Sequence, residues 1–571
     1  MGAGSSSGTI HPMPKPDAAP LPRAPLIALV GVLLLALSLR VLGLTWGLPS
    51  ATHYFSYHPD ESVVLGYSSL PAMNVFTGHL LPHFYNYGSL QLYLVCFANT
   101  AAMLAGAIDI VPKDYAIWYP QWAKMYLVGR CLSVGMGVGT VFVVYRVGER
   151  LWGRRAGLFA ALALAVMPLH AQHSHFLTVD VPATFWAMLS LLWAVRLGMG
   201  DPKPLRAALW AGVFAGLAAA TKYNLALAIL PLVAACLVTR QWKGLASGLP
   251  VSVLAFFAAC PGALLESATF LHDVRFEAAH VQNVNDPTFR DTGSGFVYHV
   301  ARNLDAGLGL PLLLLALVSV GYALYKRGRG DGLLAAFALP YYVLISLAAV
   351  RYARYVIPLL PILALWVGRM AADWSQAATP LRRGAALWAS AVTLGLTLVW
   401  CLRLVGFMAD QDMRDWALQK INSPSYSPHP PALATVGFAV MPWFGAPPIS
   451  PYFPMPRPGG WRQRVSPQEA ARIVYAGKDW DAALLEAKKP DIVVLSEYDY
   501  ADALRLKDPA ALRYLEALRR DYTPSTTFVD RNTALSTQYT LIDGLPTRGW
   551  PHDMLYTCPI ISFYIRKTLT P

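Results

Sequence analysis

Residues 26–48, LIALVGVLLLALSLRVLGLTWGL, are apolar over a length that can cross a membrane, and stretches of this kind decide the fold class. A helix needs about 20 mostly apolar residues to span the hydrocarbon layer of a bilayer. Similar stretches recur until about residue 407, so we expect a mainly α, polytopic membrane protein. Two adjacent acids, in Tyr57-His58-Pro59-Asp60-Glu61, follow the first stretch almost at once, which places carboxylates at a bilayer surface.

The composition supports this fold class. Of 571 residues, 55% are hydrophobic and 14% are charged, whereas soluble domains have about 25% charged residues. The net charge of +13 does not indicate a nucleic-acid partner, because most Lys and Arg residues before position 400 lie in short loops beside apolar stretches. Six cysteines give no disulfide framework, since four of them lie within apolar stretches.

Clusters of Lys and Arg recur at every second loop, as expected of loops on the cytoplasmic side. This pattern predicts eleven transmembrane helices, with the N-terminus inside and the C-terminal part outside. The predicted spans are 26–48, 127–147, 156–175, 181–199, 206–222, 224–239, 244–261, 308–325, 332–349, 355–371 and 385–407.

These spans divide the chain into three regions. Residues 1–24, rich in Gly, Ser and Pro, predict a disordered cytoplasmic tail. Residues 25–408 form the transmembrane domain, with long outer loops at 49–126 and 262–307. Within the first loop, residues 88–106 are apolar enough to span, but counting them would invert every later loop, so we expect a juxtamembrane or re-entrant helix. Residues 409–571 are polar and predict a small extracytoplasmic α/β domain.

Asp60 and Glu61 have two interpretations. Carboxylates after Pro59 can stabilise the exposed N–H groups at the start of a helix. A carboxylate at an interface can also remove a proton from a hydroxyl or amine nucleophile as a general base. The dipeptide alone favours helix capping.

Asp180 lies in a second outer turn, which also contains His170, His173 and His175. Asp180 can likewise cap a helix, because Pro182 falls in the first turn. The histidine spacing matches no HExxH-like zinc pattern, so hydrogen bonding to a phosphate or sugar is the better functional hypothesis. An interfacial role without function is equally compatible with these histidines.

Cations at the outer ends of helices are unusual, because the orientation rule disfavours them there. They are Arg130, Lys222, Arg351 and Arg354. One or two of them can reach lipid headgroups. Several on the same face as isolated acids indicate a pocket for a phosphate or pyrophosphate.

The order of these motifs resembles the GT-C glycosyltransferases, in particular the type that contains protein O-mannosyltransferases and the lipid A aminoarabinose transferase (glycosyltransferase family 39-like). The matching segments cover most of residues 26–407, although Gly88-Ser89 stands where many relatives have one or two prolines. These segments are 59–61, 87–94, 130–133, 151–158, 174–180, 220–223 and 351–361.

The resemblance implies a membrane enzyme that transfers a hexosyl or pentosyl group from a polyprenyl-phosphate donor to a lipid, glycan or protein acceptor outside the cytoplasm. It implies a catalytic set of Asp60, Glu61 and Asp180. Substrate-binding residues would be His58, Arg130, His173, His175, Lys222, Arg351 and Arg354. It leaves the use of Mg or Mn open, and it places the chain in a bacterial cytoplasmic membrane. The alternative from another class is a transporter or flippase of a charged lipid or solute, which acids deep within spans would favour.

Overall fold

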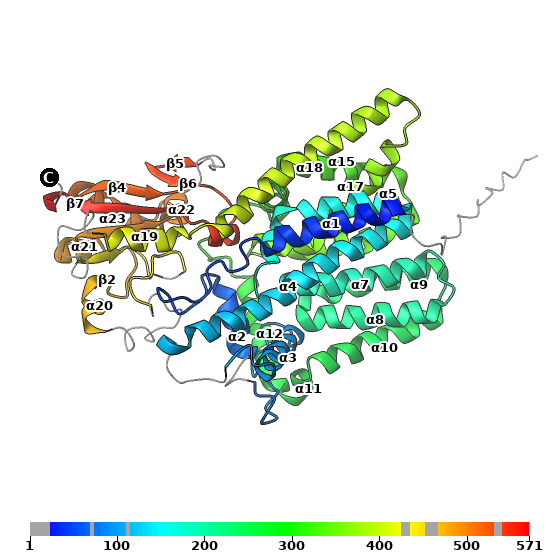
Figure 1. The fold of residues 1–571 in the computed structure, drawn as a ribbon, viewed down its shortest axis with the longest axis horizontal. Coiled ribbons are helices and arrows are strands. Elements are labelled where there is room, and N and C mark those ends of the chain that lie inside the picture. The colour runs from blue at the N-terminus through cyan, green and yellow to red at the C-terminus, as the bar shows by residue number, and fades with distance from the viewer. Residues whose placement is uncertain are drawn as a thin grey trace, which may run out of the picture.

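The computed structural model describes residues 23–68, 73–109, 115–423, 434–442, 444–451, 466–529 and 539–569. A bundle of long helices extends to residue 409, and a smaller α/β part follows at one end of the bundle (Figure 1). The predicted tail at residues 1–24 lies outside the described residues, except for its last two positions, which begin the first helix. The predicted fold class, mainly helical with a small C-terminal sheet, is confirmed.

Seven helical stretches among the described residues are long and apolar enough to cross a membrane. They are α1 (Arg23–Val41), α4 (Tyr115–Trp152), α7 (Asp180–Gly198), α8 (Pro204–Thr221), α10 (Trp242–Ala259), η3 (Ala353–Leu359) with α17 (Leu360–Trp374), and α18 (Pro380–Ala409). The other predicted spans coincide with α5 (Arg154–Val166), α6 (Pro168–His173), η1 (Tyr223–Ile229), α9 (Leu230–Thr239), α15 (Leu310–Lys326) and α16 (Arg329–Ser346). All eleven predicted spans therefore lie on helical structure.

Glycines allow α8 and α10 to pack closely. A Cβ atom on Gly212 would lie 2.3 Å from the carbonyl oxygen of Gly248, and one on Gly216 would lie 2.2 Å from that of Ser252. Small residues four positions apart permit this approach of two membrane helices. The contact fixes the end of α8, where Lys222 follows as the C-cap residue.

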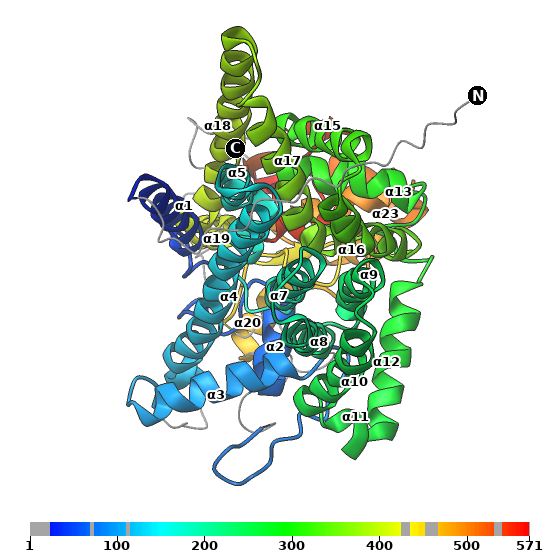
Figure 2. The ribbon, with the colours of Figure 1, turned by 90° about the vertical axis from the view of Figure 1, so that its right-hand side faces the viewer.

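The segment predicted as the first outer loop contains α2 (Pro59–Ser68) and α3 (Leu90–Leu104). Helices α7 and α8 are seen lengthwise in Figure 1 and end-on in Figure 2, whereas α3 is end-on in Figure 1 and lengthwise in Figure 2. Helix α3 therefore lies across the bundle. Its buried residue Leu92 packs in one apolar cluster with Val64 of α2 and Met125 of α4. This orientation fits a juxtamembrane helix and not a span.

The second outer loop is also helical, and it packs against the first. It contains α11 (Gly262–Leu265), α12 (Ser267–Val281), α13 (Gly295–Tyr298), η2 (His299–Leu304) and α14 (Asp305–Leu308). The N–H group of Tyr85 donates to Asp273 at 2.8 Å, and the Tyr85 hydroxyl donates to Glu266. The two loops thus form one layer over an end of the bundle.

The α/β part has a five-stranded sheet in the order β2-β1-β3-β7-β4. Strand β1 (Val436–Phe438) is parallel to β2 (Ile473–Val474) and β3 (Ile492–Ser496), with Val436 opposite Ile492. Strand β7 (Ile561–Arg566) is antiparallel to β3 and β4 (Tyr522–Phe528). A separate hairpin joins β5 (Thr540–Ile542) and β6 (Leu545–Thr547). The helical elements are α19 (Met413–Ile421), α20 (Pro467–Arg472), α21 (Ala482–Lys488), α22 (Glu497–Arg505), α23 (Pro509–Asp521), η5 (His552–Thr557) and η6 (Lys567–Leu569).

A buried arginine joins the α/β part to the first outer loop. Arg414 is fully buried and donates to both carboxylate oxygens of Asp412, at 2.7 and 2.6 Å, and to the carbonyl oxygen of Tyr556 at 2.8 Å. Its guanidinium carbon lies 3.8 Å from the ring centroid of Tyr57, and Trp46 donates to Asp412 at 2.9 Å. These contacts hold the loop before α2 against the α/β part.

Candidate active site

The two acids of α2 have different environments. Both lie in the first turn of the helix, where carboxylates stabilise the exposed N–H groups. Glu61 is fully buried, whereas the Asp60 side chain remains 22% exposed. The helix therefore directs one acid into the protein and leaves the other accessible.

Glu61 is held by Arg130. The guanidinium donates to both carboxylate oxygens, at 2.8 and 2.7 Å, and the Leu177 N–H and Ser56 hydroxyl donate to the same carboxylate at 2.7 and 2.5 Å. Burial alone would raise the pKa of Glu61, but Arg130 and these hydrogen bonds hold the pKa below its usual value. This geometry gives Glu61 a structural role, in contrast to the predicted catalytic one.

Arg130 is not placed to bind a substrate phosphate. Its Nη1 atom donates to the carbonyl oxygens of Leu44 and Trp46, at 2.7 and 2.6 Å, and its side chain is completely buried. With the two contacts to Glu61, four of its five N–H groups are occupied. The structure therefore separates Arg130 from the other cations that the sequence grouped with it.

Asp60 faces Arg354. The Nη2 atom of Arg354 lies 3.5 Å from Oδ2 of Asp60, and its Nη1 atom lies 3.6 Å from Oδ2 of Asp553. The guanidinium carbon lies 4.0 Å from the ring centroid of Tyr352. Nη1 of Arg354 is buried and has no hydrogen-bond partner among the described residues. The cation thus lies between two carboxylates and retains an unused donor.

Asp180 and Lys222 form a second pair of opposite charge. Nζ of Lys222 lies 2.6 Å from Oδ1 of Asp180 and 5.0 Å from the ring centroid of Tyr355. Asp180 begins α7 and Lys222 ends α8, so each side chain comes from a helix terminus. The charge of Arg354 also acts on Asp180, which places the two pairs in the same electrostatic environment.

The predicted histidines do not share one environment. Nδ1 of His58 accepts from the Asp60 N–H at 3.2 Å, while Nε2 of His58 is buried without a partner among the described residues. Both ring nitrogens of His173 are likewise unpartnered within that part of the chain, and the charges of Asp60 and Asp180 act on this ring. His175 instead contacts two backbone carbonyl oxygens, each at 2.9 Å, and lies outside the site.

Arg351 is also held elsewhere. Its Nη1 atom donates to the Thr292 hydroxyl at 2.7 Å, and its guanidinium lies 5.9 Å from the ring centroid of Tyr298. The motif Arg351-Tyr352-Ala353-Arg354 therefore contributes its second arginine to the site and uses its first to hold the second outer loop. The spacing in the sequence did not distinguish these two arginines.

Asp553 and Tyr556 are site residues that the sequence did not indicate. Both lie in η5 of the α/β part, and both are buried. The ring centroid of Tyr556 lies 4.8 Å from that of His58. The run from Trp550 to Tyr556 combines aromatic residues with a His-Asp pair, but nothing in this pattern specified contact with residues 200 positions earlier.

Metal ligands do not gather in the described ranges, where no three His, Cys, Asp or Glu side chains are arranged to hold an ion. The site residues there are carboxylates paired with cations, together with unpartnered imidazoles. This arrangement can accept a proton at Asp60 and can bind an anion through Arg354 and Lys222.

Comparison with known proteins finds one family match and several similar folds. Residues 124–264 match the family described as dolichyl-phosphate-mannose-protein mannosyltransferase. A crystal structure of the Archaeoglobus fulgidus oligosaccharyltransferase in complex with Zn and sulfate has a similar fold, with 14% sequence identity and a TM-score of 0.50 over 87% of this chain and 71% of that chain. The chain therefore shares the fold of this oligosaccharyltransferase, and one segment of it matches the mannosyltransferase family.

A further structure similar to this chain is ArnT from Cupriavidus metallidurans bound to undecaprenyl phosphate. The similarity covers 96% of this chain and 99% of that chain, at 14% identity and a TM-score of 0.47. No curated protein matches the chain. The transporter alternative has no support in these comparisons. The segment matched to the mannosyltransferase family contains Arg130, His173, His175, Asp180 and Lys222, whereas Asp60, Arg351 and Arg354 lie outside it.

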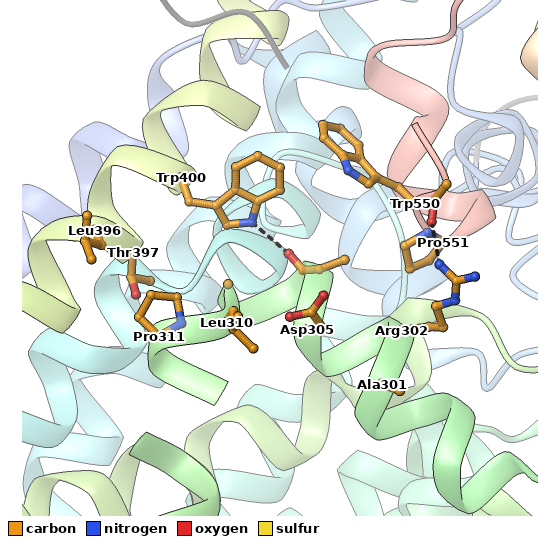
Figure 3. A pocket seen from close by; sticks show the side chains of 13 residues that line it. Ala301, Arg302, Asp305, Leu310, Pro311, Leu396, Thr397, Trp400, Trp550 and Pro551 are labelled. Carbon is orange, nitrogen blue, oxygen red and sulfur yellow. Dashed lines mark hydrogen bonds between the residues drawn. The ribbon is translucent and has the colours of Figure 1, made fainter. Parts of the chain in front are cut away.

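The chain also has a cavity of about 320 Å³ away from these residues, between η2, α15, α18 and residues 549–551 (Figure 3). At its edge, Trp400 donates to the Ala306 carbonyl oxygen at 2.9 Å, and Arg302 donates to that of Gly549 at 3.2 Å. Its described lining contains none of the residues predicted for the site. The cavity therefore belongs to the junction between the bundle and the α/β part.

Proposed function

We propose that this chain transfers a sugar from a polyprenyl-phosphate donor to an acceptor on the extracytoplasmic side of a bacterial cytoplasmic membrane. The matched family takes its name from a lipid-phosphate sugar donor, which supports this class of donor. The observation that carries the proposal is the contact of Asp60 with Arg354, a partly exposed carboxylate 3.5 Å from a cation that has an unused N–H donor.

In the proposed reaction, an acceptor hydroxyl or amine attacks the anomeric carbon of the donor sugar. A bond forms between the acceptor atom and that carbon, and the bond from the carbon to the phosphate oxygen breaks. Asp60 accepts the acceptor's proton, and polyprenyl phosphate leaves with the electron pair. Arg354 and Lys222 stabilise the phosphate, on which negative charge accumulates.

Asp180 holds Lys222 in this arrangement. The contact of 2.6 Å fixes an ammonium group that would otherwise rotate freely on a four-carbon side chain. Tyr355 lies on one side of the ammonium group, which leaves fewer directions for its remaining donors. Asp180 therefore acts through Lys222 and not as a second base.

His58 supplies a hydrogen-bond donor to a substrate oxygen. Burial lowers the pKa of His58 to about 4, so the imidazole is neutral at neutral pH. Because Nδ1 accepts from the Asp60 N–H, the ring proton resides on Nε2. A buried donor without a partner costs free energy, and a sugar hydroxyl or phosphate oxygen would satisfy it. His173, which acts electrostatically on His58, offers two further ring nitrogens without a partner among the described residues.

The C-terminal part and the site lie on the same side of the membrane in this proposal. Asp553 belongs to the α/β part, yet its carboxylate contacts the Arg354 that faces Asp60. A single cysteine at the exposed position Leu512 tests the side. We expect a membrane-impermeant maleimide to label Leu512→Cys in intact cells. Labelling only after cell lysis would show that the α/β part lies on the cytoplasmic side and would contradict the proposed orientation.

Reconstituted transfer tests the reaction. The full chain in lipid nanodiscs would be given polyprenyl-phosphate mannose, as a hexosyl donor, or polyprenyl-phosphate arabinose, as a pentosyl donor, with membranes from a deletion strain as the acceptor source. We expect release of polyprenyl phosphate together with a mass increase of one sugar on an acceptor. A transporter would instead move the intact donor between leaflets without cleaving it.

A further inference from the structure

Asp553 of the α/β part binds the backbone at the start of η3. Its Oδ1 atom accepts the N–H group of Ala353 at 2.9 Å, and its Oδ2 atom accepts that of Arg354 at 2.9 Å. The side chain is completely buried. A carboxylate that accepts two backbone N–H groups at a helix start acts as a cap, and here the cap comes from a segment about 200 residues away in the chain.

The same carboxylate attracts the Arg354 side chain. Nη1 of Arg354 lies 3.6 Å from Asp553, and Nη2 lies 3.5 Å from Asp60. Hydrogen bonds between a guanidinium and a carboxylate measure about 2.7–2.9 Å, so the guanidinium is held between two acids without closing on either one. Its stacking on Tyr352, at 4.0 Å, fixes the plane in which it lies.

Arg354 lies 3.5 Å from Asp60, within a group of titratable side chains. Charged and titratable groups from α6, η3, η5 and the segments before α2, α3 and η3 act electrostatically together with Asp60: His58, Tyr87, His173, Tyr352, Arg354, His552 and Tyr556. Arg354 is the permanent cation in this set. A cation that closes on a carboxylate lowers the carboxylate pKa by about 1–3 units, which would weaken it as a base.

We propose that Asp553 is a positioning residue, which holds Arg354 out of hydrogen-bonding contact with Asp60 and thereby keeps Asp60 a competent base. This inference rests on the proposed function, in which Asp60 is the base. It assigns the α/β part a direct influence on the reaction through one carboxylate. When a donor phosphate arrives, Arg354 can bind it through the N–H groups that neither acid uses.

The test compares Asp553→Asn with Asp491→Asn. Asp491 is also a buried acid of the α/β part, and it accepts from the N–H and hydroxyl of Thr435 and from Arg566, far from Arg354. Both substitutions remove one buried charge and retain an acceptor oxygen. The control therefore reports the effect of lost stability alone.

In Asp553→Asn, we expect kcat for transfer to fall at least about tenfold, because Arg354 closes on Asp60 and weakens it as a base. The acid limb of the pH–rate profile should move to lower pH by about one unit or more. In Asp553→Glu, the acid limb of the pH–rate profile should lie closer to its wild-type pH than in Asp553→Asn. In Asp491→Asn, the limb and KM should match the wild type. A fall in kcat in Asp553→Asn with an unmoved acid limb would overturn the proposal.

A structure of the Asp553→Asn variant tests the inference without an activity assay. We expect the separation of Arg354 Nη2 from Asp60 Oδ2 to contract from 3.5 Å to hydrogen-bond length. An unchanged or longer separation would overturn the positioning role. A wild-type protein that transfers no sugar would instead refute the proposed function, and the geometry of the variant would remain decisive for Asp553.

Discussion

Asp60 and Glu61 are consecutive residues of α2, but Glu61 is closed into a bidentate pair with Arg130 while Asp60 lies partly exposed beside Arg354. Substitutions at these two positions should therefore have opposite effects. One should remove activity without loss of structure, and the other should remove structure.

Asp60→Asn should abolish transfer and leave folding intact. The asparagine amide cannot accept the acceptor's proton, and general base catalysis contributes about 10²–10⁴-fold. Among the described residues, the only ion pair that the substitution weakens is the 3.5 Å contact with Arg354. Turnover would be measured with polyprenyl-phosphate sugars, and thermal unfolding in detergent would report stability. Wild-type turnover in this variant would refute the assignment of Asp60 as the base.

Glu61→Gln should destabilise the protein. It leaves Arg130 buried without its counter-charge, and breaking a buried ion pair from one side costs about 3–5 kcal/mol. That is a large share of the roughly 5–15 kcal/mol by which folded proteins are stable. We expect a lower yield of folded protein and a lower unfolding temperature than for Asp60→Asn. A stable Glu61→Gln variant without turnover would return Glu61 to the catalytic set.

Arg354→Gln should raise KM for the donor, whereas Arg351→Gln should change it less than about threefold. A hydrogen bond to a charged group contributes about 1.5–3 kcal/mol, which predicts an increase of roughly 10- to 150-fold for Arg354. Arg351 provides the matched control, because its guanidinium donates to Thr292. Equal effects of the two substitutions would contradict the division of the motif.

Asp180 and Lys222 should behave as one unit in a double-mutant cycle. Asp180→Asn and Lys222→Gln should each raise KM for the donor, because each disturbs the ammonium group that contacts the phosphate. The double variant should be little worse than either single variant, since residues in direct contact are not additive. Independent, additive losses would indicate that Asp180 contacts the substrate itself.

Acid should destabilise the protein between about pH 6.5 and pH 4. Burial lowers the pKa of His58 and of His552 to about 4 in the folded chain, whereas an unfolded histidine has a pKa near 6.5. In this window the unfolded state binds more protons, so the free energy of unfolding falls as pH falls. His58→Asn should flatten the dependence of unfolding temperature on pH. An unchanged slope would show that His58 does not contribute.

Much of the fold could be predicted from sequence, because membrane spans depend on local apolarity. Apolar runs in the sequence at 433–440, 491–495 and 560–565 likewise overlap β1, β3 and β7. The site was predictable only in part. Asp60, Asp180, Lys222 and Arg354 share one region because their helix ends meet there, as loop topology indicates. The buried pairing of Glu61 with Arg130 could not be predicted, because it depends on the direction of each side chain within its helical turn, which residue spacing does not specify.

Asp553 was beyond the reach of sequence reasoning for a different reason. Its partners are backbone N–H groups at residues 353 and 354, and such contacts leave no residue-type signal at either end. Arg351 and Arg354 differ only in which neighbour meets each guanidinium. Local patterns therefore identify which groups are available, and long-range packing decides which of them meet.

The docking of η5 against η3 has a consequence for biosynthesis. Asp60, Asp180, Lys222 and Arg354 are all synthesised by residue 354, but the carboxylate that orders Arg354 is residue 553. At synthesis rates of about 5–20 residues per second, the helices enter the membrane many seconds before the centre is complete. In the proposed function, a nascent chain would therefore meet lipid-linked sugars before Asp60 is a competent base, and full activity would follow only after the later segment has folded back.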